Sequence, residues 1–259
     1  MSLLHDAFAR AKSENRAALI AYLPAGYPTE DGAVACIAAM VEGGVDIVEI
    51  GFPYSDPVMD GPTIQDAVNI SLEGGTKSAT VINTVKRVAD LGVPALVMSY
   101  WNPIERYGVD SFASDFHAAG GVGVITPDLT PEEAEDWISA TNSHDVDRVF
   151  LVALSSSDER IAKVANATTG FIYAGAVMGV TGARTSISDA IEGLVAKVRR
   201  HSDLPVAVGL GVSTPEQAHE IAQYADGVIV GSAFVTAIKK DGAAGAKALA
   251  QALSKGLAR

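Results

Sequence analysis

The chain has 259 residues, of which 48% are hydrophobic and 19% are charged. This mixture supplies a large core and excludes an intrinsically disordered chain, and the length suits one (β/α)₈ barrel. The formal net charge of −12 argues against nucleic acid or an anionic membrane as a partner, although backbone amides can still bind a small phosphate.

The N-terminal segment, residues 1–16, has an amphipathic helical pattern without a signal-peptide core or cleavage site. No apolar run is long enough to span a bilayer. The single cysteine, Cys36, excludes an internal disulfide and a cysteine-based metal site, and it favours a reducing compartment. We therefore expect a cytoplasmic protein that begins with an extra helix.

Short runs of Val, Ile, Leu and Ala recur along the chain, each followed by a helical pattern. Runs without polar alternation are typical of strands buried on both faces of a parallel sheet. Eight such units with short links predict a single (β/α)₈ TIM barrel, with residues 1–259 as one domain. A doubly wound open sheet is the alternative, because local patterns do not show closure. The strands are expected at residues 17–23, 46–51, 95–100, 121–125, 148–153, 171–174, 205–209 and 227–230.

Helix starts are marked by a threonine followed by acidic residues, at residues 29–31, 130–133 and 214–217. Two links exceed the minimal unit. Residues 61–73 predict an extra helix in loop 2, and residues 175–188 form a long glycine-rich loop 6. Barrel enzymes place their chemistry in loops at the C-terminal ends of the strands, so the extra length indicates a functional region or a lid.

Two carboxylates belong to this region. Glu49 shares one face of its strand with Val45 and Ile47, and a glutamate in a buried strand is costly unless it is used or paired. Inside the barrel, desolvation would raise its pKa, as a proton donor and acceptor requires; a salt bridge to a neighbouring strand is the structural alternative. Asp60 follows in the same loop, where Asp60-Gly61 also fits a simple turn.

Glycine clusters follow the last three expected strands, at residues 179–182, 209–213 and 231–232. Loops after strands 7 and 8 commonly bind phosphate in barrels, and Ser232 begins a predicted extra helix in loop 8 whose N-terminus would face an anion. Ordinary tight turns are the alternative. No histidine or lysine stands at the end of an expected strand, so we expect neither a metal site nor a Schiff-base lysine.

Three segments resemble the tryptophan synthase alpha family, and the resemblance covers the whole chain. They are VEIGFPYSDPVMDGPTIQ from Val48, YAGAVMGVTGART from Tyr173 and VGLGVSTPEQA from Val208. The resemblance implies a retro-aldol cleavage of indole-3-glycerol phosphate to indole and glyceraldehyde 3-phosphate, with Glu49 as acid/base and Asp60 on the indole N–H. It further implies phosphate binding by Gly182, Gly211, Gly231 and Ser232, a lid contact from Thr181 to Asp60, and an indole pocket of Tyr22, Ile125, Leu151 and Tyr173.

The resemblance also implies a partner. Family members pair with a PLP-dependent beta subunit in an αββα heterotetramer, and the alpha chain carries no metal or organic cofactor. Residues 53–57 and Asn102-Pro103 would lie at that interface. The chain departs from the family pattern at Tyr22, where Phe is common, and at residues 126–130 and 154–156.

Two other functions stay open at this point. Another phosphate-binding barrel, such as a sugar-phosphate isomerase, would share the glycine clusters but would not need Glu49 and Asp60 in one loop. A chiefly regulatory subunit would bind the phosphate and show little activity alone.

Overall fold

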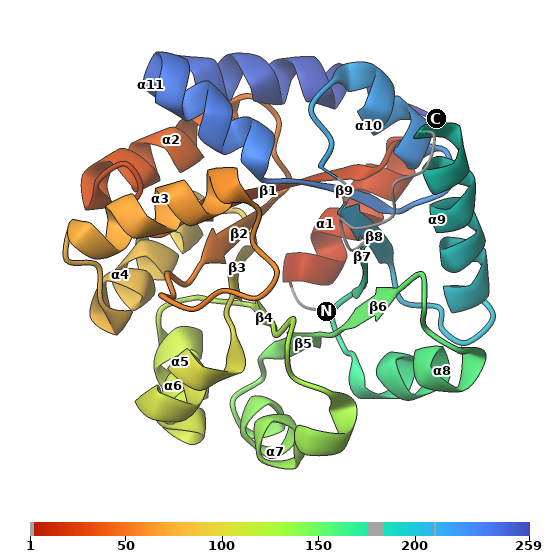
Figure 1. Ribbon diagram of the computed structural model, residues 1–259, viewed down its shortest axis with the longest axis horizontal. Helices are drawn as coiled ribbons and strands as arrows, with labels where there is room; N and C mark the ends of the chain where they lie inside the picture. Colours follow the sequence, from red (N-terminus) through yellow and green to blue (C-terminus); the bar gives the residue numbers. More distant parts are fainter. Residues whose placement is uncertain (1–2, 176–183, 210) are drawn as a thin grey trace.

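The computed structural model describes residues 3–175, 184–209 and 211–259. Its strands form a barrel surrounded by helices (Figure 1), and every pairing between neighbouring strands is parallel. Their order is β5-β4-β3-β2-β1-β9-β8-β7-β6. The strands are β1 Ala18–Pro24, β2 Ile47–Gly51, β3 Ala95–Met98, β4 Gly123–Ile125, β5 Asp147–Val149, β6 Leu151–Ala153, β7 Ile172–Gly175, β8 Val206–Gly209 and β9 Gly227–Val230.

The two ends of this order, β5 and β6, are consecutive in the chain and separated only by Phe150. The strand expected at residues 148–153 is therefore divided in two. The Phe150 carbonyl accepts a hydrogen bond from the Tyr173 N–H at 3.2 Å, which links the division to β7. Because the sheet runs round to meet itself, the barrel prediction is confirmed and the open doubly wound alternative is wrong.

The helices alternate with the strands, and additional ones occupy the expected loops. α3 fills loop 2, and the helix expected after β9 is the first part of α11, which is kinked at Gly242. α5 follows β3 directly and was not expected. The helices are α1 Leu3–Ser13, α2 Glu30–Glu42, α3 Pro62–Glu73, α4 Ser78–Ala89, α5 Trp101–Tyr107, α6 Val109–Ala118, α7 Glu135–Ser143, α8 Asp158–Ala167, α9 Arg184–Val198, α10 Pro215–Ala222 and α11 Ser232–Lys255, with a 3₁₀ turn at Pro131–Glu133.

The helix starts predicted from threonine caps are confirmed at two positions and wrong at the third. The Thr29 side chain accepts a hydrogen bond from the Gly32 N–H at 3.0 Å, and Thr214 and Gln217 form a reciprocal capping box before α10. At residues 130–133 the same motif instead makes a 3₁₀ turn, and α7 begins only at Glu135. There the Thr130 hydroxyl donates to the Glu133 carboxylate rather than capping a backbone N–H.

The core has two layers, one between the strands and the helices and one inside the barrel. α1 covers the inner layer at the N-terminal ends of the strands. There Leu4 and Phe8 are buried, and the Phe8 ring lies 5.6 Å from that of Phe171. In the described part of the chain, no helix has the length and apolar character needed to cross a membrane. The inner layer comprises Leu4, Ala7, Phe8, Ala11, Ala18, Ile20, Ile47, Leu96, Ile125, Val149, Phe171, Ala207 and Ile229.

Candidate active site at the mouth of the barrel

Glu49 lies inside the barrel, near the C-terminal end of β2. Alternation along the strand places Ile47 in the inner core and Val48 and Ile50 in the outer core, so Glu49 faces inward with Ile47. Its side chain is 2% exposed, and its Oε2 atom has no hydrogen-bond partner among the described residues. The salt-bridge alternative is therefore wrong for the described part of the chain, where no ion pair includes Glu49.

The environment of Glu49 favours its protonated form. Burial is the main cause, and the nearby Asp60 carboxylate adds to it, so the pKa of Glu49 is raised to about 8. Asp60 is half-buried; burial raises its pKa too, while the Tyr100 hydroxyl lowers it. A carboxylic acid that holds its proton near neutral pH thus lies beside a second carboxyl group. This pair suits proton transfer next to a developing positive charge.

Tyr100 is a site residue that sequence reasoning missed. It lies two residues after the end of β3 and is 3% exposed. Its hydroxyl accepts a hydrogen bond from the Met59 N–H at 3.0 Å, and burial raises the pKa of Tyr100 to about 12. This contact holds loop 2 so that Asp60 lies over the mouth. Counting inward positions along β3, from Leu96 through Met98, would have led to Tyr100.

Tyr22 on β1 and Tyr173 on β7 lie at the mouth, on the two strands that flank the β9–β8 pair. Tyr22 is the register partner of Glu49, and Tyr173 is the register partner of Ala207. Each ring leans toward the C-terminal end of the neighbouring strand and covers a glycine two residues beyond its partner. A Cβ on Gly51 would collide with the Tyr22 hydroxyl, and a Cβ on Gly209 with the Tyr173 hydroxyl.

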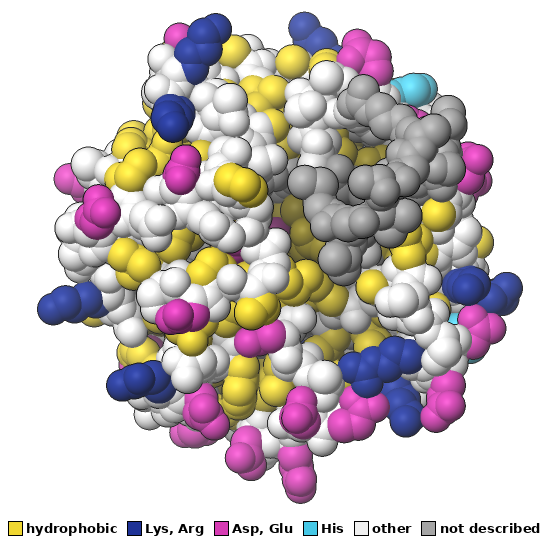
Figure 2. Space-filling view, in the orientation of Figure 1, with side chains coloured by type: hydrophobic (Ala, Val, Ile, Leu, Met, Phe, Trp, Pro, Cys, Tyr) yellow, Lys and Arg dark blue, Asp and Glu magenta, His cyan; other side chains and the backbone are white. Residues whose placement is uncertain are grey.

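The described part of the expected phosphate site also lies at this end. Gly211 and Gly231 each follow by two residues the register pair Gly209–Ile229, so both turns lie at the mouth beside each other. Gly211 has a φ of +66°, which favours glycine, and Ser232 is the first residue of α11. Lys and Arg side chains lie toward the rim in Figure 2, so an anion at the centre would be met by N–H groups and a helix N-terminus.

The remaining expected site residues divide into two groups. Ile125 is 1% exposed in the inner core, whereas Leu151 is half-buried and packs against that core with Tyr173. Ile125 therefore contributes to the floor beneath the carboxylates. Thr181 and Gly182 lie outside the described residues.

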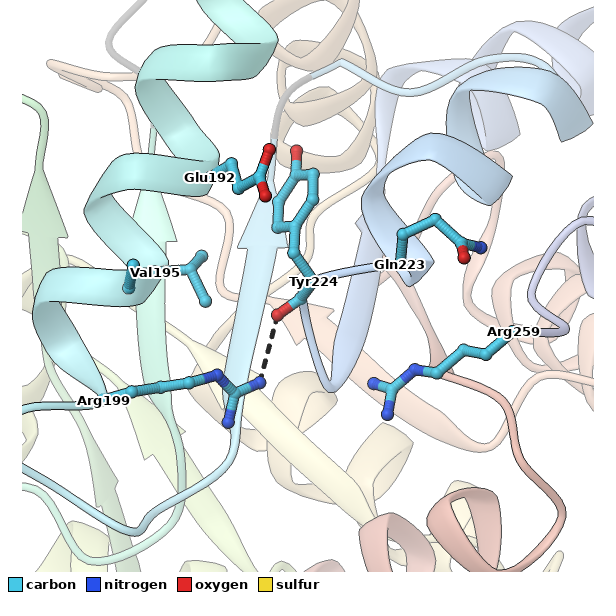
Figure 3. Close-up of a pocket in the computed structure, with 7 residues that line it drawn as sticks. Glu192, Val195, Arg199, Gln223, Tyr224 and Arg259 are labelled. Atoms are coloured by element: carbon cyan, nitrogen blue, oxygen red, sulfur yellow. Dashed lines mark hydrogen bonds between the residues drawn. The ribbon is translucent and has the colours of Figure 1, made fainter.

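A hollow of about 310 Å³ lies away from the carboxylates, between α9 and α10. Figure 3 shows the Tyr224 ring beside Glu192 and the guanidinium groups of Arg199 and Arg259 below it. Arg199 donates to the Tyr224 carbonyl and to Asp226, which precedes β9. Because these bonds surround the N-terminal ends of strands, we interpret the hollow as part of the stabilising face.

Within residues 3–175, 184–209 and 211–259, no cluster of three or more His, Cys, Asp or Glu side chains could hold a metal ion. His144 accompanies Asp110 at 2.9 Å on the outer helices, and His219 bonds the Gly256 carbonyl. His144 and His219 therefore bond groups at the periphery of the barrel rather than at its mouth.

Comparison with known proteins gives one consistent result. The family model for the tryptophan synthase alpha chain matches residues 8–257. The tryptophan synthase alpha chain of Nocardia farcinica is 55% identical over 256 residues, covering 99% of this chain and 96% of that protein. A structure of Mycobacterium tuberculosis tryptophan synthase has a TM-score of 0.94 at 52% identity, covering 99% of this chain and 98% of that one. Subunit alpha from Legionella pneumophila has a TM-score of 0.90 at 30% identity, covering 99% and 98%.

Proposed function

The chain belongs to the tryptophan synthase alpha chain family, lyases that cleave indole-3-glycerol phosphate in tryptophan biosynthesis, and we propose that Glu49 and Asp60 perform this cleavage at the barrel mouth. The family assignment removes the sugar-phosphate isomerase alternative. The reaction needs no cofactor in this chain, since PLP belongs to the beta subunit.

The observation that carries the assignment of the site is the state of Glu49. Its side chain is 2% exposed, its Oε2 atom lacks a partner among the described residues, and its pKa is about 8. Glu49 donates its proton to indole C3 and then removes the proton of the adjacent side-chain hydroxyl. The carbon–carbon bond breaks as that hydroxyl becomes the aldehyde, which releases indole and glyceraldehyde 3-phosphate.

Asp60 acts as the anionic partner in this step. Protonation of C3 places positive charge on the indole ring, and a carboxylate at the ring N–H stabilises that charge. Burial opposes the ionised form of Asp60, and the Tyr100 hydroxyl favours it by lowering its pKa. The two neighbouring carboxyl groups therefore divide the work, with Glu49 protonated and Asp60 ionised before cleavage.

The phosphate is proposed to bind at Gly211, Gly231 and Ser232, joined by Gly182 from loop 6. The N-terminus of α11 supports this, because its free N–H groups attract an anion. Binding energy from the phosphate would orient the scissile bond. Thr181 is proposed to contact Asp60 as a lid, and Tyr22, Ile125, Leu151 and Tyr173 to line the indole pocket.

The partner is proposed to be the PLP-dependent beta subunit, in an αββα heterotetramer in the cytoplasm. Val58 and Met59, 76% and 47% exposed, adjoin the expected interface at residues 53–57. Two neighbouring apolar side chains exposed beside this segment support a contact surface there. We also infer that residues 1–259 form one domain, because the Ala17 N–H donates to the Leu257 carbonyl and joins the two ends of the chain.

Indole release from indole-3-glycerol phosphate tests the catalytic assignment, with and without added beta subunit. Glu49→Gln and Asp60→Asn should each lower kcat about 10²–10⁴-fold, the usual range for a lost acid–base group. Asp66→Asn, an exposed residue on α3, is the matched control and should keep full activity. Full activity in Glu49→Gln would refute the acid/base assignment. Cleavage that appears only with the beta subunit would favour the chiefly regulatory reading.

A further inference from the structure

The Tyr22 hydroxyl is a polar group that the cleavage mechanism leaves without a task. Tyr22 is 7% exposed, and among the described residues its hydroxyl makes no hydrogen bond to a protein group. The oxygen is not fully buried, so it stays open to the mouth of the barrel, where a phenol can donate a hydrogen bond. A phenylalanine would fill the same volume without this donor. The surroundings of the hydroxyl show which group could accept from it.

The Tyr22 ring is confined between two glycines on neighbouring strands. On one side, a Cβ on Gly231 would lie 3.3 Å from the Tyr22 Cδ1 atom, so the ring packs against the turn after β9. On the other side, the hydroxyl occupies the space above Gly51 that a side chain would fill. Gly51 is the next inward position after Glu49 along β2. The Tyr22 hydroxyl, which comes from β1, thus lies over β2, one layer above Glu49.

In the described part of the chain, Glu49 has a carboxyl oxygen that lacks a hydrogen-bond partner. Its Oε2 atom is buried and has no hydrogen-bond partner among the described residues, which is tolerable only while the acid is neutral. After it gives its proton to the substrate, Glu49 carries a full charge in an apolar barrel. A donor one layer above would stabilise that charge. An unused donor and an acceptor lacking a partner thus occupy adjacent strands in register.

The titratable groups that face Glu49 come from several elements. They are Asp60 on loop 2, Tyr22 on β1 and Tyr173 on β7, while Tyr100 after β3 faces Asp60 and Tyr22. Asp60 is an acceptor when ionised. The Tyr173 hydroxyl lies over Gly209 on β8, three strands from β2 in the sheet order, whereas the Tyr22 hydroxyl lies over Gly51 on β2 itself. Tyr22 is therefore the phenol best placed to donate to Glu49.

We propose that Tyr22 is a positioning residue whose hydroxyl donates a hydrogen bond to the Glu49 carboxylate once Glu49 has released its proton. The hydrogen bond holds the carboxylate toward the mouth, where it next removes the proton of the substrate hydroxyl. This inference rests on the proposed role of Glu49 and adds a second polar group to the acid/base step. It also explains why Gly51 follows Glu49 at the next inward position.

The test is Tyr22→Phe, which keeps the ring between Gly51 and Gly231 and removes only the oxygen. Loss of a hydrogen bond to a charged group should raise the pKa of Glu49 by about one unit. Titration of ¹³C-carboxyl-labelled glutamate by NMR measures this shift directly, without substrate. The alkaline limb of the kcat/KM profile, which reports the protonated acid, should move upward by the same amount, and kcat should fall about tenfold.

Tyr100→Phe is the matched control, because Tyr100 acts on Asp60. It should move the acid limb of the profile upward and leave the Glu49 titration in place. An unchanged Glu49 titration in Tyr22→Phe, or a shift of the acid limb alone, would overturn the proposal. Thermal unfolding of both variants separates these results from a loss of folding.

Different results would contradict the proposed cleavage site and the proposed role of Tyr22. If Glu49→Gln retains full cleavage, the proposed function of the site is wrong, whatever Tyr22→Phe does. If Glu49→Gln is inactive and the Glu49 titration in Tyr22→Phe equals that of the wild type, only the role of Tyr22 is wrong.

Discussion

Asp46 and Glu49 are two buried carboxyl groups three positions apart, one directly before β2 and one within it. Asp46 is 4% exposed and Glu49 is 2% exposed. Asp46 accepts hydrogen bonds from Arg16 at 2.6 and 2.8 Å and from the Leu19 N–H at 2.9 Å. Glu49 has an oxygen without a partner in the described structure, and its nearest charged neighbour is the acidic Asp60.

The difference shows how one strand serves stability at one end and chemistry at the other. At the N-terminal end, a bidentate guanidinium offsets the desolvation of Asp46, and the pair ties the segment after α1 to β2. Toward the C-terminal end, no ion pair among the described residues offsets the desolvation of Glu49, so its pKa stays high. An acid that is poorly solvated in its charged form is the one that can give and take a proton near neutral pH.

The largest effect on folding is expected from breaking the paired carboxylate. Asp46→Asn removes the charge that accepts from the Arg16 guanidinium and the Leu19 N–H, which should lower the free energy of unfolding by about 3 kcal/mol, the low end of the range for a buried pair. The low end applies because Glu14 still contacts Arg16, whose side chain is 21% exposed. Urea unfolding followed by circular dichroism measures it. Folded Asp46→Asn should cleave substrate at the wild-type rate. A loss of stability below about 1 kcal/mol would show that the pair is not structural.

The opposite sign is expected from neutralising the unpaired carboxyl group. With a pKa of 4.5 unfolded and about 8 folded, Glu49 keeps its proton in the native state and releases it on unfolding, so wild-type stability falls as pH rises from about 4.5 to 8. Glu49→Gln removes this dependence and should be more stable by on the order of 3 kcal/mol at pH 7. Unfolding at pH 4 and pH 7 checks it; an equal difference at both values would contradict the prediction.

A smaller change is expected from removing the like charge beside Glu49. Burial is the larger cause of its raised pKa and Asp60 the second, so Asp60→Asn should lower the pKa of Glu49 without returning it to that of a solvated glutamate. The NMR titration of labelled glutamate measures this shift. A rise, or a full return to 4.5, would show that the two causes are ranked wrongly.

The smallest effect should come from the outer arginine of the Asp46 cluster. Arg10 lies 3.4 Å from Asp46, but its side chain is 56% exposed, so solvent screens the pair. Arg10→Ala should cost at most about 0.5 kcal/mol. Comparison with Arg16→Met in the same urea series checks it, since the Arg16 variant should lose several times more. Equal losses would place the stabilising charge on the wrong arginine.

Several features could be predicted from the sequence because they depend on neighbours along the chain. Uninterrupted apolar runs indicated parallel strands, and the long link after the second strand indicated the extra helix in loop 2. Period-two alternation placed Glu49 on one face with Ile47, and threonine caps located the starts of α2 and α10. Each of these signals acts within a few residues, where backbone geometry dictates which side chains share a face.

Other features were decided only when distant segments met. The barrel rather than an open sheet, the division at Phe150, the α5 helix and the start of α7 at Glu135 depend on packing between elements. So do the partners of the carboxyl groups. Alternation placed Asp46 on the face opposite Glu49, but its partner became known only when Arg16 from the preceding segment reached it. Tyr100 became a site residue only once β3 brought it against loop 2. Sequence determined which face of the strand each carboxyl group occupies. The packing of distant segments determined which of the two is paired, and so which carboxyl group stabilises the fold and which one is left to carry a proton.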